Sequence, residues 1–175
     1  MNDKNAFQPG PLADVHCHMD AGRPTLVMVR HLRHAPSKVW SALTDPAQLR
    51  EWAPFAPDRD LGQLGAATLS MTDGQDATFP ATVLRCEPPT LLEYTWGNDV
   101  LRWELEAVEH GTRLTLHHTV DDPTSVAKVA AGWHVCLVVA EHLLDGQPIG
   151  PIVGENAMNY GWQALHDGYA TKLGI

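Results

Sequence analysis

The sequence predicts one α+β domain in which a curved antiparallel sheet wraps around a long C-terminal helix. Two observations predict this architecture. The middle of the chain reads as a run of strands joined by short turns, and residues 123–144 read as a helix with one apolar stripe. A sheet with one apolar face and a helix with one apolar stripe must bury these surfaces against each other.

The region before the central strands predicts two strands and two short helices. Asp14 to Asp20 alternates polar and apolar residues and precedes turn residues, which indicates a short strand entering a hairpin. Thr25 to Arg33 is rich in β-branched and apolar side chains, which predicts the first main strand. Pro36 suits the first turn of a helix, and Thr44-Asp45-Pro46 supplies the cap and the first-turn proline of a second helix.

The central strands are predicted from four segments with short separators. Pro88-Pro89, Gly97-Asn98-Asp99 and His110-Gly111 are turn-forming, and short turns make consecutive strands antiparallel neighbours. In Leu101 to Glu106 apolar and charged residues alternate, so the sheet has one buried face and one solvated face. The predicted strands are Thr78 to Cys86, Leu91 to Trp96, Val100 to Val108 and Arg113 to Val120.

The end of the chain predicts two helices. Asp121-Asp122-Pro123 offers an aspartate cap and a first-turn proline to the long helix, and Asp145-Gly146 ends it. After a loop rich in proline and glycine, Glu155 to Leu173 reads as a last helix. We therefore predict a single domain over residues 1–175, made of an N-terminal extension with a short strand (1–24), a core (25–146), and a loop with the terminal helix (147–175).

Composition restricts the partners and the cellular location. The chain has 12 basic and 21 acidic residues and a formal net charge of -9, which would repel nucleic acid and anionic membranes. Residues 1–8 lack the pattern of a secretory signal, and no apolar run approaches the roughly 20 residues that span a bilayer, so we expect a cytoplasmic protein. The three widely spaced cysteines predict reduced thiols, two of them buried: Cys17, Cys86 and Cys136.

An ordered series of short motifs covers most of the chain. It begins with Ala35-Pro36-x-x-Val39-Trp40-x-x-Leu43-Thr44-Asp45-Pro46, continues with Leu92-x-Tyr94-x-Trp96 and Trp103-x-Leu105, and ends with Ala131-Gly132-Trp133-His134-x-Cys136-Leu137. These residues resemble the activator-of-heat-shock-ATPase-homologue-like (AHSA-like) branch of the START and birch-pollen-allergen-like (SRPBCC) superfamily. The resemblance spans about residues 25–170 and depends on the order of the motifs rather than on any one of them.

The resemblance implies a helix-grip fold whose sheet and long helix enclose a mostly apolar cavity. Members of the superfamily bind lipids, hormones or polyketides there, and a minority catalyse cyclisation or dehydration, so the fold alone selects no single role. The family has no invariant catalytic set to carry over, and we expect no cofactor. The cavity-facing positions in this sequence are Tyr94, Trp96, Trp103, Leu105, Leu116, His118, Trp133 and Leu137.

The leading hypothesis is a binding module for a small, largely apolar molecule held between sheet and helix. The alternative is a cyclase- or dehydratase-type enzyme with His118 as acid or base, helped by Tyr94. His118 is the polar exception on the face of Leu114, Leu116 and Val120, but it also fits a buried histidine satisfied by hydrogen bonds. A second alternative is a co-chaperone-like or stress-related protein-interaction module, with a homodimer or another protein as partner.

Two histidine-containing patterns are candidates for a metal site. Asp14, His16, His18 and Asp20 share one strand face, a spacing that can present several ligands to one ion. The same alternation is typical of a solvated strand near a terminus, which we favour. His134, beside Trp133, gives a second imidazole near the predicted cavity, but no third ligand accompanies it, so no metal site is predicted.

Two tryptophans of the helix motif are interpreted structurally. Trp40 and Trp52 are large side chains that would fix the two short helices on the sheet rather than contact a ligand.

Overall fold

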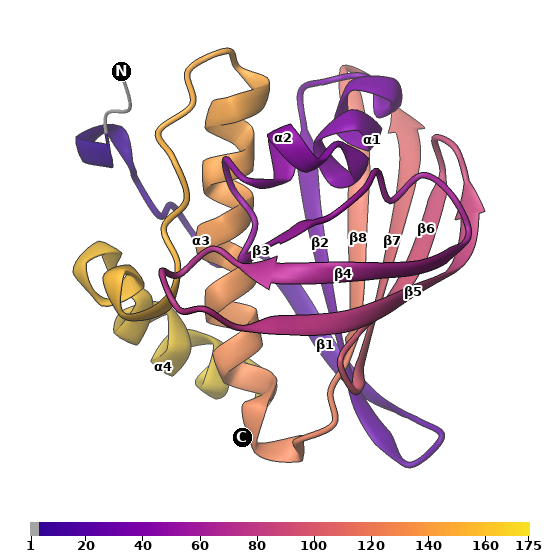
Figure 1. Ribbon diagram of the computed structural model, residues 1–175. Helices are drawn as coiled ribbons and strands as arrows, with labels where there is room; N and C mark the ends of the chain where they lie inside the picture. The colour runs from indigo at the N-terminus through magenta and orange to yellow at the C-terminus, as the bar shows by residue number, and fades with distance from the viewer. Residues whose placement is uncertain (1–3) are drawn as a thin grey trace.

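The computed structural model describes residues 4–175, and a long helix lies against the concave face of one curved sheet (Figure 1). Within these residues the strands are β1 (Asp14–Asp20), β2 (Arg23–Leu32), β3 (Phe55–Pro57), β4 (Gly65–Met71), β5 (Thr78–Glu87), β6 (Leu91–Trp96), β7 (Asp99–Val108) and β8 (Gly111–Thr119). They are antiparallel and ordered β1-β2-β8-β7-β6-β5-β4-β3. The predicted helix-grip fold is confirmed.

Short helices and turns connect the strands and close the fold. The helical elements are the 3-10 turns η1 (Lys4–Ala6), η2 (Pro123–Ser125) and η3 (Gly154–Tyr160), and the α-helices α1 (Pro36–Thr44), α2 (Pro46–Leu49), α3 (Val126–Leu144) and α4 (Trp162–Leu173). The predicted caps are present: the Asp45 carboxylate accepts from the Ala47 N–H (3.1 Å), and Asp122 accepts from the Thr124 N–H (2.9 Å). The sequence therefore marks where α2 and the turn before α3 begin.

The C-terminal segment differs from its prediction. One helix was expected from Glu155 to Leu173, but a 3-10 turn and an α-helix meet at Gly161. Gly161 has a φ of 88°, a left-handed conformation that glycine adopts without steric cost and that interrupts the α-helical hydrogen-bond ladder. The interruption sets η3 and α4 in different directions, and both lie on the side of α3 away from the central strands (Figure 1).

Helix α3 is more apolar than its sequence stripe suggested. The helical run Pro123–Leu144, made of η2 and α3, is by length and composition apolar enough to cross a membrane. The expectation that no apolar run approaches the length of a membrane span was therefore wrong. In the fold, 67% of its most apolar window is buried. Its faces are covered by the sheet on one side and by the C-terminal segment on the other, because α3 packs against both β2 and α4. The apolar character therefore reflects a core helix covered on two sides.

The N-terminal arm, residues 7–13, is fastened to both C-terminal helices by a buried histidine. His134 is 0% exposed, its Nε2 lies 2.6 Å from the Pro9 carbonyl oxygen, and its Nδ1 lies 2.5 Å from the Tyr169 hydroxyl. The Tyr169 oxygen also accepts from the Ala13 N–H at 2.8 Å. Since a carbonyl only accepts, Nε2 carries the proton and Nδ1 accepts from the tyrosine. The imidazole is therefore neutral in this network.

Acidification is expected to destabilise the protein through His134. Burial, and secondarily the charge of Arg30, lowers the pKa of His134 below its ordinary value, although the Pro9 carbonyl and Glu141 act in the opposite direction. Below about pH 6.5 the unfolded chain binds a proton that the folded imidazole resists, so the free energy of unfolding falls as the pH falls through this window. Urea denaturation at pH 7.5 and pH 5.5 measures this loss.

The matched variants are His134→Gln and His31→Gln, the second at an exposed position of β2. The loss between the two pH values should be smaller in His134→Gln than in the wild type and in His31→Gln. Some loss should persist, because burial and the charge of Arg102 also lower the pKa of His117. Equal losses in all three proteins would contradict the assignment to His134.

Candidate functional site

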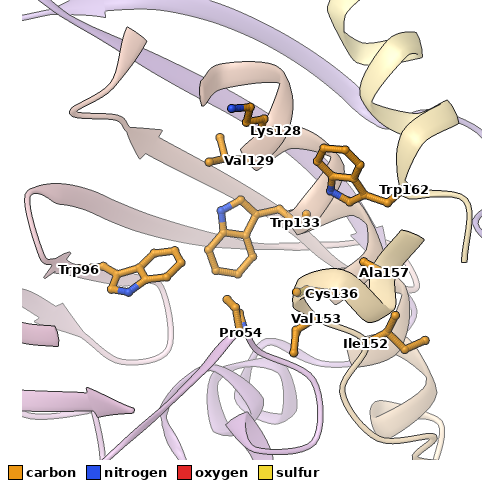
Figure 2. A pocket seen from close by; sticks show the side chains of 12 residues that line it. Pro54, Trp96, Lys128, Val129, Trp133, Cys136, Ile152, Val153, Ala157 and Trp162 are labelled. Atoms are coloured by element: carbon orange, nitrogen blue, oxygen red, sulfur yellow. The ribbon is translucent and has the colours of Figure 1, made fainter. Parts of the chain in front are cut away.

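A pocket of about 320 Å³ lies between α3, the segment that follows α3, and the turn before β3 (Figure 2). Its walls are almost entirely apolar, and indole rings from β6, α3 and α4 surround it. It is the candidate binding site, because an apolar hollow with few polar groups is typical of small-molecule sites. The lining residues are Pro54, Trp96, Lys128, Val129, Gly132, Trp133, Cys136, Ile152, Val153, Gly154, Ala157 and Trp162.

The pocket lies beside the sheet–helix interface, and only part of the predicted wall contributes to it. Trp96 and Trp133, two of the predicted cavity-facing residues, line it. The other predicted positions are buried without lining it, each at most 4% exposed: Tyr94, Trp103, Leu105, Leu116, His118 and Leu137. The sequence therefore predicted the apolar interior correctly but misplaced the hollow.

Aromatic side chains from the turn after α2 fill the centre, where the cavity was expected. The Trp52 ring lies 6.2 Å from Trp103 and 6.4 Å from Trp133, measured between ring centroids. Phe55 lies 6.2 Å from Tyr94 in an edge-to-face arrangement. These side chains come from residues 52–55, and the structural role expected for Trp52 agrees with its burial, whereas no pattern placed Phe55 in this interior.

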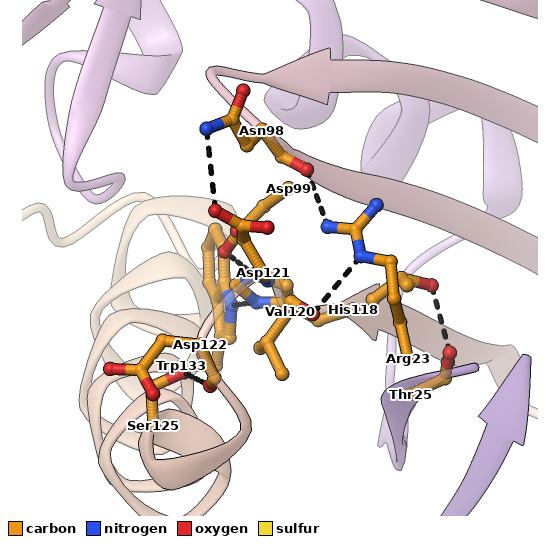
Figure 3. A network of polar contacts seen from close by, with 11 residues as sticks. Arg23, Thr25, Asn98, Asp99, His118, Val120, Asp121, Asp122, Ser125 and Trp133 are labelled. Atoms are coloured by element: carbon orange, nitrogen blue, oxygen red, sulfur yellow. Dashed lines mark hydrogen bonds and ion pairs between the residues drawn. The ribbon is translucent and has the colours of Figure 1, made fainter. Parts of the chain in front are cut away.

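His118 is held between a carboxylate and an indole (Figure 3). It is 0% exposed, its Nε2 lies 2.6 Å from Asp99 Oδ2, and its Nδ1 accepts from Trp133 Nε1–H at 2.8 Å. An indole nitrogen only donates, so His118 Nδ1 is unprotonated and Nε2–H donates to Asp99. The buried histidine with satisfied hydrogen bonds is thus the observed arrangement, with Asp99 and Trp133 as partners.

Asp99 is the charged end of this chain of hydrogen bonds. Burial acts to raise the pKa of Asp99, but the hydrogen bond from His118, the Asp121 N–H at 3.0 Å and the charge of Arg23 outweigh it and lower the pKa. Arg23 in turn donates to the carbonyl oxygens of Asn98 (2.5 Å) and Val120 (3.3 Å). The start of β2, the β6–β7 turn and the end of β8 are joined in one network (Figure 3).

This geometry decides what His118 can do at the pocket. It does not line the pocket, and both of its ring nitrogens are engaged inside the protein. A general acid or base needs a nitrogen within hydrogen-bond reach of its substrate. Its hydrogen bond instead fixes the rotation of the Trp133 ring, which forms a pocket wall.

The candidate metal-binding positions of β1 lie outside the pocket, whereas one cysteine lines it. Asp14, His16, His18 and Asp20 are exposed on β1, and the described residues contain no group of three or more acidic, histidine or cysteine side chains placed to hold a metal ion. Cys136 is a pocket residue, and burial raises the pKa of its thiol to about 12, so it is protonated at neutral pH.

The burial of the cysteines corrects one prediction. Two buried thiols were expected, but Cys17 is exposed and Cys86 half-buried, leaving Cys136 as the buried one among the three free cysteines. β1 is an edge strand with solvent on both faces beyond Val15, so its alternation does not bury Cys17.

The sequence missed the pocket residues of the C-terminal segment. Ile152, Val153 and Ala157 stand in a stretch read as a loop and a helix start, and their apolar side chains were the available signal. This segment is supported from outside, since the Tyr160 ring meets the Phe7 ring of the N-terminal arm edge to face at 5.6 Å.

Comparisons with known proteins agree with the fold. The model of the family described as Activator of Hsp90 ATPase homolog 1-like protein matches residues 33–144. Among curated proteins none matches the chain. The crystal structure of CalU16 from Micromonospora echinospora has a TM-score of 0.66 at 20% identity and covers 91% of this chain and 95% of its own. The crystal structure of MLL2253 from Mesorhizobium loti has a TM-score of 0.63 at 26% identity and covers 70% of this chain and 97% of its own.

A third solved structure, the AHSA1-like protein from Aeromonas hydrophila, has a TM-score of 0.58 at 21% identity, with 70% of this chain and 92% of that chain covered. The family match ends at the end of α3. The pocket walls from Ile152 to Trp162 therefore lie outside the matched region, while Trp96 and Trp133 lie inside it.

Proposed function

The chain belongs to the family of Activator of Hsp90 ATPase homolog 1-like proteins, and from this premise we propose that it binds a small, largely apolar molecule in the pocket walled by Trp96, Trp133 and Trp162. The fold of this family commonly binds hydrophobic ligands. One observation carries the proposal for this chain: three indole rings from separate elements converge on one apolar hollow (Figure 2). Burial of apolar ligand surface there would supply the affinity.

The size of the pocket fits a ligand of one or two rings. A volume of about 320 Å³ is at the lower end of small-molecule sites. A two-ring ligand that buries ~200 Å² of apolar surface would gain about 5 kcal/mol from burial. The loss of translational and rotational freedom offsets part of this gain, so we expect dissociation constants in the micromolar to millimolar range.

The walls are fixed before any ligand enters. Trp133 is held by His118, and the Trp96 ring packs against Phe55 with ring centroids 4.8 Å apart. Trp162 stacks on His166 at 5.2 Å with an interplanar angle of 25°. Fixed aromatic walls lower the entropy cost of binding, which supports a binding role for these rings.

Replacing Trp162 by alanine is expected to weaken binding of the neutral probe naphthalene-1-acetamide by about tenfold, because one aromatic wall is removed. The matched control is Trp40→Ala, which removes another half-buried indole, from α1, that does not line the pocket. Isothermal titration calorimetry measures both. Equal affinities of the two variants, or no heat of binding in the wild type across a panel of such probes, would contradict the proposal.

The interaction hypothesis, the homodimer and the cytoplasmic location stay predictions.

A further inference from the structure

The polar side-chain groups around the pocket are hydrogen-bond donors. Of the side chains that line it, Lys128 carries an ammonium group, and Trp96 and Trp162 carry indole N–H groups. Neither an ammonium nor an indole can accept a hydrogen bond. Within residues 4–175, no carboxylate, amide oxygen, hydroxyl or imidazole belongs to the side chains that line the pocket. A ligand that matches the walls therefore presents acceptors.

The indole donors of two pocket residues have no partner inside the protein among the described residues. In the described part of the chain, the indole N–H groups of Trp96 and Trp162 have no hydrogen-bond acceptor, whereas that of Trp133 is taken by His118. Both rings are half-buried, so a ligand can reach them. A purely apolar occupant would leave any of these N–H groups that it covers without a hydrogen bond, which is unfavourable.

Lys128 is the charged residue of the pocket wall, and it lies on α3 five residues before Trp133. Among the described residues it forms no ion pair with a carboxylate. Hydrogen bonds from Thr124, and to a smaller extent the charge of Lys128, lower the pKa of Asp122. The Oδ1 atom of Asp122 accepts from the Thr124 N–H at 2.9 Å and from the Thr124 hydroxyl at 2.7 Å. The ammonium is therefore available to an anion at the mouth of the pocket.

We propose that the ligand is a compact apolar carboxylate, with its ring or acyl body between Trp96, Trp133 and Trp162 and its carboxylate paired with Lys128 (Figure 2). This inference rests on the proposed function and names the chemical class of the ligand. One cation beside an apolar hollow fixes the orientation of the ligand, with the carboxylate at the mouth and the apolar body inside. A charge-assisted hydrogen bond from lysine discriminates an acid from its neutral isostere.

The net negative charge of the protein opposes the expected preference for an acid over its neutral isostere, so observing that preference would be informative. At -9, the field of the whole chain disfavours any anion, so tighter binding of the acid must come from the local cation. The attraction to Lys128 should weaken as salt is added, because the ammonium is exposed and mobile ions screen it. The affinity of a neutral isostere should not respond to salt in this way.

The experiment compares naphthalene-1-acetate with naphthalene-1-acetamide, which share one ring system and differ in charge. By calorimetry at low salt, the wild type should bind the acid about tenfold more tightly than the amide. Lys128→Met should abolish this preference and leave the affinity for the amide within about twofold, while Lys128→Arg should keep the preference. The control Arg85→Met removes one positive charge from an exposed side chain of β5 and should keep the preference as well.

Each outcome separates this inference from the proposed function. If the wild type binds acid and amide equally, or if Lys128→Met still prefers the acid, the carboxylate assignment is overturned while binding in the pocket stands. If neither compound binds the wild type, or if both bind Trp162→Ala as tightly as the wild type, both are overturned. Because Lys128 is exposed, thermal melting should show that Lys128→Met folds as the wild type does.

Discussion

Replacing Trp52 by alanine is expected to lower the free energy of unfolding by about 4 kcal/mol. The side chain is 1% exposed and touches the rings of Trp103 and Trp133. Its indole N–H also donates to the Ala42 carbonyl oxygen at 2.9 Å, which joins the turn after α2 to α1. The variant would leave a large void at the centre of the aromatic interior and an acceptor without its partner.

The matched control is Trp40→Ala, four residues into α1. Trp40 is half-buried, so its removal exposes less apolar surface and opens no closed cavity, and we expect a loss below about 1.5 kcal/mol. Urea denaturation at pH 7.5 measures both variants. If both variants lose a similar free energy of unfolding, the burial of Trp52 against Trp103 and Trp133 does not stabilise the interior as argued.

Replacing His118 by leucine is expected to cost about 3 kcal/mol. The leucine preserves apolar volume but leaves the Asp99 carboxylate and the Trp133 indole N–H without their partners. Both groups are inside the fold or at its edge, where water replaces the lost hydrogen bonds poorly. The loss of this bond also frees the Trp133 ring to rotate, so near-ultraviolet circular dichroism from tryptophan should change.

The next residue of the same strand provides the control. His117 points to the outer face of the sheet, where its Nε2 lies 2.6 Å from Glu104 Oε1 and 3.5 Å from an Arg102 nitrogen. The Glu104 side chain is 45% exposed, so water can replace the contact and His117→Leu should cost less than about 1 kcal/mol. Equal losses for the two histidines, or an unchanged tryptophan spectrum in His118→Leu, would contradict the positioning role.

The pocket is an outcome of how three parts of the chain meet. α3 turns one side to the sheet and the other to the segment that follows it, and the pocket forms along the second contact. The N-terminal arm supports that segment through Phe7 and through the hydrogen bonds of His134 and Tyr169. The segments on both sides of the family region thus shape the candidate site.

The sequence by itself determined most of the secondary structure. The predicted central strands agree with β5 to β8 to within one or two residues at each end, because alternation and turn residues are local signals. The caps Asp45 and Asp122 were also read correctly, since a cap depends on its neighbours in sequence. The ordered motifs predicted the family as well, and the family match confirms it.

The tertiary structure alone decided where the hollow lies and what His118 does. An alternating pattern tells which face of a strand is buried, but it does not tell how side chains from distant segments divide the buried volume. Trp52 and Phe55 fill the space between the sheet and α3, and residues between Ile152 and Trp162 form one wall of the pocket on the other side of α3. The partners of His118 come from positions 19 residues before it and 15 after it, a proximity that close packing of the folded chain creates and that no local pattern encodes.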